Sequence, residues 1–231
     1  MQVFALLPWY DWLALLWFFA AWIGYAWFAR HWGLRRASLL ATTNRYRRHW
    51  MLKATWRDPR VLDGIITQSL SSSPSFFASA TIIIIGGLLA LLGTTDKAAE
   101  FVREIPFAAR TTTAVFELKV LVLLGIFVNA FFRFTWSMRQ YTFGALMLGS
   151  MPPPEDFATG KFDREHFAER AGKLLGMAAE TFNDGIRAYY FSFAAMSWFF
   201  SPLIFGVVSA LVVAVLYSRE FHSEVLHVLR D

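Results

Sequence analysis

Residues 189–217 carry no charged side chain, and this limits what the chain can fold into. A helical crossing of a membrane's hydrocarbon core needs about 20 mostly apolar residues in a row. Three more stretches satisfy this requirement: residues 8–29, 75–93 and 113–132, the last continuing as a helix to residue 149. We therefore predict an all-α fold. Residues 1–231 would form a single transmembrane domain, a polytopic transmembrane helix bundle with four spans plus interfacial amphipathic helices.

The composition narrows the class of protein further. Hydrophobic residues make up 56% of the chain and charged residues 17%, whereas an ordinary soluble domain has about 45–50% and about 25%. Without cysteine, the chain can have no disulfide, thiolate metal site or cysteine nucleophile. All histidines lie outside the apolar stretches, which disfavours an intramembrane haem. We find no phosphate-binding loop, dinucleotide fingerprint or serine-hydrolase motif, so we expect no enzyme activity, cofactor or metal.

The distribution of lysine and arginine predicts the orientation in the membrane. Basic side chains gather after the first span and again over residues 133–187, and such segments usually face the cytoplasm. This places the N- and C-termini outside a bacterial inner (cytoplasmic) membrane, with the amphipathic stretch 96–110 also outside. The formal net charge of +5 would then face anionic lipid headgroups rather than nucleic acid.

Residues 36–56 mix basic and aromatic side chains at helical spacing, which is typical of a helix lying at the headgroup level. This helix would either dock lipid or a partner, or serve as an ordinary basic anchor of the membrane protein. The residues expected to face lipid are Arg45, Arg47, Arg48 and Lys53.

A polar segment, residues 63–75, leads into the second span. It is rich in hydroxyl groups, with Ser71, Ser72 and Ser73 followed by Pro74. Irregular backbone at membrane depth is tolerated only against protein or water. The segment is therefore interpreted either as a broken or re-entrant element beside an aqueous path, or as a solvated helix start with Pro74 in the first turn.

Polar residues inside an apolar span are costly and often functional. In the third span Lys119, Asn129, Arg133 and Gln140 fall on one side of a helix at 100° per residue. This stripe would either line a water-filled path that favours anions or a lipid phosphate, or face the bundle interior.

If the stripe faces the interior, its two cations need carboxylate partners. We expect Arg133 to pair with Asp184, Glu180 or Asp63, and Lys119 to pair with Glu117 or Asp11. A second group of polar residues would form a cytoplasmic mouth to the fourth span, in which Pro202 is expected to kink the helix. This group comprises Asp63, Asn183, Asp184 and Arg187.

Several short runs resemble an uncharacterised family of integral membrane proteins, found in bacteria and plants and known only as a domain of unknown function. They cover residues 44–51, 63–66 with 75–79, 117–119, 131–136 with 139–141, and 183–191. The resemblance spans almost the whole chain and implies an inner-membrane protein with four spans, but no activity.

Two classes of function remain open. The first is an oligomeric channel or carrier for a small ion, with an anion favoured, whose pore would lie on the axis of a homo-oligomer. The alternative is a non-catalytic accessory or scaffold subunit that docks a membrane protein partner. A lipid-handling protein that uses the basic residues is a third, weaker interpretation.

Overall fold

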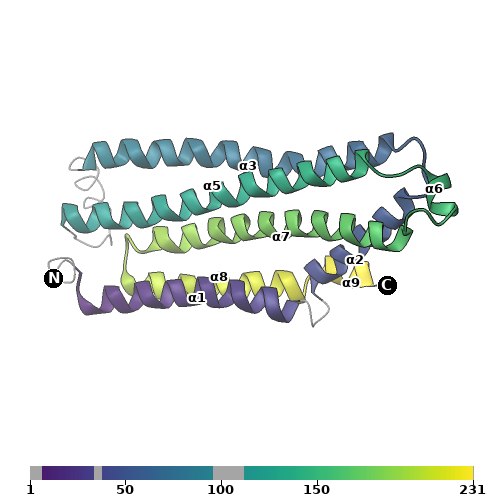
Figure 1. Ribbon diagram of the computed structural model, residues 1–231. Helices are drawn as coiled ribbons and strands as arrows, with labels where there is room; N and C mark the ends of the chain where they lie inside the picture. The colour runs from purple at the N-terminus through teal and green to yellow at the C-terminus, as the bar shows by residue number, and fades with distance from the viewer. Residues whose placement is uncertain (1–6, 34–37, 96–111, 231) are drawn as a thin grey trace.

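The computed structural model describes residues 7–33, 38–95 and 112–230, and all of its regular structure in these ranges is helical (Figure 1). The helices are α1 (Trp9–Gly33), α2 (Leu39–Ala54), α3 (Val61–Gly93), α5 (Thr113–Gly149), α6 (Pro154–Ala158), α7 (Arg164–Ser197), α8 (Pro202–Phe221) and α9 (Glu224–Arg230). Four of them, α1, α3, α5 and α8, are long and apolar enough to cross a membrane. The predicted all-α, multi-pass class is confirmed. The predicted stretch 96–110 lies outside the described residues.

The helices of the bundle differ in length, and this divides the bundle into two regions. Helices α3, α5 and α7 lie side by side, and α1 and α8 run together along the other side of α7 (Figure 1). At 1.5 Å per residue, the 20 residues of α8 extend about 30 Å, one hydrocarbon core, whereas the 37 residues of α5 extend about 55 Å. The long helices therefore project beyond α1 and α8 at one end, where α2, α6 and α9 gather. We call this end the cap and the remainder the membrane region.

The predicted fourth span, residues 189–217, is not one helix. Helix α7 ends at Ser197 and α8 begins at Pro202, and the two helices pack against each other. Ser201 caps α8, since its side chain accepts a hydrogen bond from the amide of Leu203. A proline at the first helical position loses no helical hydrogen bond. Pro202 therefore starts a new helix instead of kinking an old one, and the chain reverses direction.

This reversal changes the topology. Because α7 runs the length of the bundle before α8 returns, the start of α1 and helix α9 lie at opposite ends (Figure 1). The predicted arrangement with both termini on one side of the membrane does not follow from this fold. The sequence does not separate the second half of α7 from α8, because no charged residue lies between positions 188 and 217.

The polar segment before the second span also differs from both predictions. Helix α3 is continuous from Val61 to Gly93, and Pro74 lies buried inside it. Pro74 has no N–H and leaves the carbonyl of Leu70 without its usual helical donor. The hydroxyls of Ser71 and Ser72 donate to the carbonyls of Gln68 and Ser69 within the helix. The segment is therefore regular helix, neither a re-entrant element nor a helix start.

Large rings fill the membrane region. Phe18 of α1 is fully buried, contacts Phe191 of α7 at 5.6 Å between ring centroids and contacts Phe205 of α8 at 5.0 Å. Trp198 stacks on Phe205 at 5.2 Å. These rings fill the space between α1, α7 and α8.

Small side chains allow close helix packing in the cap. A Cβ atom at Gly172 of α7 would lie 2.7 Å from Cα of Arg48 in α2, so only glycine fits there. Ala168, Ala171 and Ala178 are buried on the same helix. Two arginines tie the connecting segments together: Arg60 donates to the carbonyls of residues 54, 151 and 152, and Arg164 donates to the carbonyl of Thr55.

Candidate functional site

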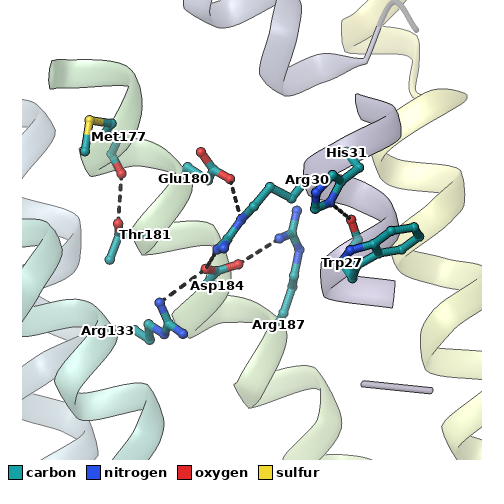
Figure 2. A network of polar contacts seen from close by, with 9 residues as sticks. All are labelled: Trp27, Arg30, His31, Arg133, Met177, Glu180, Thr181, Asp184 and Arg187. Carbon is teal, nitrogen blue, oxygen red and sulfur yellow. Dashed lines mark hydrogen bonds and ion pairs between the residues drawn. The ribbon is translucent and has the colours of Figure 1, made fainter. Parts of the chain in front are cut away.

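The largest group of ion pairs lies where the membrane region meets the cap. It joins Arg30 near the end of α1, Arg133 of α5, and Glu180, Asp184 and Arg187 of α7 (Figure 2). Arg133 follows the start of α5 by 20 residues, about 30 Å of helix or one hydrocarbon thickness. A hydrocarbon core that begins at the start of α5 would therefore end at the level of these side chains. We call the group the arginine cluster.

Asp184 is the centre of the cluster, since its carboxylate contacts three guanidinium groups (Figure 2). Arg187 donates to Oδ1 at 2.8 Å, and Arg30 donates to Oδ2 at 3.0 Å. Arg133 approaches Oδ2 at 3.6 Å, an ion pair without a good hydrogen bond. The sequence-based expectation that Arg133 pairs with Asp184 is met by this geometry.

The charges in the cluster do not balance. Arg30 has a second carboxylate partner, Glu180, at 3.2 Å. Counted formally, three arginines face two carboxylates, so the group carries one positive charge in excess. Arg187 is buried at 7% side-chain exposure, whereas Arg30 and Arg133 are 54% and 45% exposed. The two exposed arginines therefore have N–H groups available for a further acceptor.

A pocket of about 400 Å³ opens beside the cluster. Its polar wall contains Asn129, His31 and the three arginines with Asp184. Its apolar wall comes from one face of α1, through Phe19, Trp22, Ile23, Ala26 and Trp27. Such a pocket offers cationic donors at one end and hydrocarbon along the other, which suits an anionic group attached to an apolar body.

Close packing of α5 against α7 supports the cluster. Gly185 follows Asp184, and a Cβ atom there would lie 2.4 Å from the ring of Phe134, the neighbour of Arg133. Only glycine lets the two helices approach at this level. Nearby, Thr181 donates to the carbonyl of Met177, and His31 Nδ1 donates to that of Trp27 (Figure 2). These local bonds satisfy polar groups around the cluster without using its arginines.

The predicted cytoplasmic mouth is only partly assembled. Asp184 and Arg187 belong to the arginine cluster, while Asn183 lines a smaller pocket of about 110 Å³ with Tyr190 and Arg219. Asp63 lies elsewhere, fully buried at the start of α3. Its Oδ1 accepts from Trp50 Nε1 at 2.7 Å and from Arg57, and its Oδ2 has no partner among the described residues.

The predicted polar stripe on α5 is divided among different surroundings. Asn129 and Arg133 face the pocket. Gln140 is buried, and its Oε1 has no hydrogen-bond partner in the part of the chain that the structure describes. Lys119 lies near the opposite end of α5. The four residues thus share one side of a helix but do not line one path.

Lys119 has a structural explanation. Its Nζ donates to the carbonyl of Trp198 at 2.8 Å and lies 5.2 Å from the centre of that indole ring. The indole Nε1 of Trp198 donates in turn to Asp11 at 2.6 Å. Lys119 therefore does not form the predicted ion pair with Asp11 directly. The tryptophan lies between the two charges, and the three residues hold the turn between α7 and α8.

Helix α2 packs along α7. Arg48 pairs with Glu169 at 3.2 Å, and Lys53 lies 5.7 Å from the ring of Trp56. Arg47 donates to Asn44 at 2.8 Å, and burial lowers its pKa while Tyr141 opposes that shift. Arg45 is exposed. Lipid contact by Arg45, Arg47, Arg48 and Lys53 stays a prediction.

The sequence contained signals for some but not all of the cluster. Arg30 directly follows an apolar stretch, as an ordinary loop charge would, so its position in the sequence does not indicate its ion pairs with Glu180 and Asp184 of α7. No local sequence pattern singles out Gly185, because its importance comes from the close approach of α5 to α7. Across the described ranges, no three His, Asp or Glu side chains lie close enough to hold a metal ion.

The fold and the cluster define a class: a multi-pass helical membrane protein with a helical cap and a charged boundary between the two. Residues 13–225 match the family described as "Protein of unknown function, DUF599". The chain belongs to this family, as its motif runs led us to expect. Comparisons with curated proteins and with solved structures find no match.

Proposed function

We propose that this protein binds an anion at the arginine cluster and acts as a membrane carrier for it. The observation that supports this most is the charge excess around Asp184, where three arginines share two carboxylates beside an open pocket. Guanidinium groups bind phosphate and carboxylate through paired N–H donors. The excess charge lies on Arg30 and Arg133, which are about half exposed, so it is accessible to an anion.

We propose a bacterial inner-membrane location with the cap in the cytoplasm. The cap contains the arginine-rich α2 and, in the first half of α7, Arg164, Arg170 and Lys173, and lysine and arginine side chains favour the cytoplasmic side. With this orientation the start of α1 faces outside and α9 faces the cytoplasm. The arginine cluster then opens at the cytoplasmic headgroup level. A tag after residue 230 would report from the cytosol, whereas an external signal would contradict this orientation.

The experiment compares anion-induced stabilisation of the purified protein with that of two matched variants. A ligand that binds the folded state raises the melting temperature. Millimolar inorganic phosphate should stabilise the wild type more than chloride at equal ionic strength. Arg133→Gln should remove this difference, while Arg139→Gln should retain it, since Arg139 is an exposed arginine on the same helix whose side chain lies near Phe143.

Equal phosphate responses in the wild type and Arg133→Gln would contradict the proposed site. Flux from proteoliposomes then tests the carrier role separately. Arg133→Gln should slow anion release, and Arg139→Gln should not. Binding without flux would leave an anion site in a protein that is not a carrier.

A scaffold role is the second candidate, supported by an aromatic surface on the cap. Trp56 and Phe162 are 54% and 43% exposed although they lie outside the membrane region. Arg164 lies 4.3 Å from the Trp56 ring and 5.1 Å from that of Phe157, which links these side chains into one surface. Exposed aromatic and arginine side chains are typical of protein interfaces. Purification from native membranes without a stoichiometric partner would count against this role.

A further inference from the structure

We infer that the ligand of the arginine cluster is the phosphate headgroup of an anionic phospholipid, whose acyl chain lies along the exposed face of α1. This inference deepens the proposed anion site by naming the chemistry of its ligand. It follows from the continuity between the charged pocket and an apolar groove on the same helix.

The groove begins where the pocket ends. A second hollow is shallow and open, because α1 alone forms it, through Trp12, Leu15, Leu16, Phe19, Ala20, Ile23 and Gly24. Phe19 and Ile23 line both the hollow and the arginine pocket. The charged site and the apolar groove are therefore one continuous surface.

Helical spacing explains this continuity. Residues 12, 16, 19, 23, 27 and 30 are separated by three or four positions, so they lie on one face of α1. Arg30 ends this face at the cap side. Within residues 7–33, 38–95 and 112–230, no other helix covers its middle, since Leu16 is 69% exposed and Ile23 65% exposed. The face thus presents one guanidinium group followed by an apolar track.

The dimensions fit one leaflet of a bilayer. From Arg30 to Phe19 the helix rises about 16 Å, and half of a hydrocarbon core is about 15 Å. A phosphate between Arg30 and Arg133 would place the first carbons of its lipid beside Trp27 and Ile23. A free inorganic anion could use the arginines, but it would gain nothing from this apolar wall.

The excess positive charge and the exposure of the two arginines favour a phospholipid with net negative charge over a zwitterionic one, because the arginines repel the choline cation of the latter. Arg30 uses Nε on Glu180 and Nη2 on Asp184, so its Nη1 points to neither carboxylate in these contacts. Arg133 has a single ion pair, at 3.6 Å, among the residues described. Each can donate to a phosphate oxygen while Asp184 holds the pair in place.

The test measures lipid retained by the full-length protein, using two lipids that differ only in the headgroup. The protein is exchanged into detergent with dioleoyl phosphatidylglycerol or dioleoyl phosphatidylcholine, and bound lipid is counted by native mass spectrometry. The wild type should retain phosphatidylglycerol preferentially. Arg133→Gln and Arg30→Gln should each weaken that retention about tenfold, and Arg139→Gln should leave it unchanged.

Two matched substitutions on α1 test the groove. Ile23→Ala and Leu13→Ala both shorten exposed aliphatic side chains of α1, but only Ile23 lines the groove. Ile23→Ala should weaken retention of the dioleoyl lipid about threefold. Because Ile23 lies beside the first carbons of the chain, Ile23→Ala should also weaken retention of dihexanoyl phosphatidylglycerol, whereas Leu13→Ala should change retention of neither lipid.

The outcomes separate this inference from the proposed anion site. Equal retention of the two dioleoyl lipids, or unchanged retention in Arg133→Gln, would overturn the inference. If inorganic phosphate still stabilises the wild type through Arg133, the anion site stands and its ligand is a free anion. If neither phosphate nor phosphatidylglycerol depends on Arg133, both proposals fail.

Discussion

The membrane region and the cap are held together by different side chains. In the membrane region, rings such as Phe18, Phe191 and Phe205 fill the space between helices. In the cap, glycine and alanine on α7 bring α2 into backbone contact, as at Gly172. Lipid tails are as apolar as leucine, so helices in a bilayer gain little from hiding apolar surface and depend on packing and hydrogen bonds. The cap faces water and gains from burial itself.

The largest effect is expected at the boundary of the two regions. Asp184→Asn keeps the shape of the side chain but leaves three arginines facing only Glu180. We expect unfolding free energy to fall by about 3 kcal/mol, because Arg187 is buried and loses its carboxylate. The same change raises the positive charge of the pocket, so phosphate should stabilise the variant more than the wild type. Thermal unfolding with and without phosphate measures both effects.

If phosphate stabilised Asp184→Asn less than the wild type, this result would contradict the view that the cluster attracts anions. Glu169→Gln is the matched control, since Glu169 is an exposed carboxylate of α7 that pairs with Arg48 in the cap. It should change stability by less than about 1 kcal/mol and leave the phosphate response as it is.

Two core truncations compare the regions directly. Leu175 of the cap and Phe18 of the membrane region are both almost fully buried. Leu175→Ala should lower the free energy of unfolding by about 3 kcal/mol, because the lost transfer free energy of the removed atoms and the cost of the cavity add together. Phe18→Ala removes more atoms but should cost only about 2 kcal/mol, mainly for the cavity. Chemical unfolding in detergent measures both, and a much larger cost at Phe18 would remove the proposed difference.

A smaller effect is expected from a single methyl group in the cap. Gly172→Ala places Cβ 2.7 Å from the backbone of Arg48 and should cost about 2 kcal/mol as α2 is pushed from α7. Gly64→Ala in α3 meets no atom within 4 Å and should stabilise the helix by about 0.5–1 kcal/mol. Thermal unfolding of the two variants should therefore move in opposite directions.

The smallest effect concerns one hydrogen bond inside the membrane region. The hydroxyls of Thr81 in α3 and Tyr189 in α7 are 2.8 Å apart. Tyr189→Phe should cost about 0.6 kcal/mol, the usual value for such bonds between membrane helices. A double-mutant cycle with Thr81→Val isolates this value, and a coupling above about 2 kcal/mol would show that polar contacts, rather than ring packing, dominate here.

The sequence predicted the parts of the fold that depend on local pattern. Helix α5 begins at Thr113 and ends at Gly149, as its apolar run and terminal glycine indicate. The reversal at residues 198–201 was also signalled, because a serine followed by proline is typical of a helix start. The residues on both sides of this turn are uncharged, so the sequence favours one continuous span there. Pro74 is the opposite case, because it lies inside a continuous helix whereas Pro202 begins one. Neighbouring helices can stabilise a proline inside a membrane helix.

The candidate site was predictable only in part, for a physical reason. The pairing of Arg133 with Asp184 follows from the cost of a lone charge in lipid. The role of Arg30 depends on α1 lying beside α7, which no local pattern reveals. The apolar track beside Arg30 can be read from spacing along α1, but its exposure depends on which faces the other helices cover.

The central claim is that an anion binds between Arg30 and Arg133, and anomalous scattering tests it most directly. Selenate has the shape and charge of a phosphate-like dianion, and selenium can be located in a crystal. We predict an anomalous peak in the pocket beside Asp184, lost in crystals of Arg133→Gln. A pocket without selenium, with peaks only on the exposed arginines of α2, would contradict this claim.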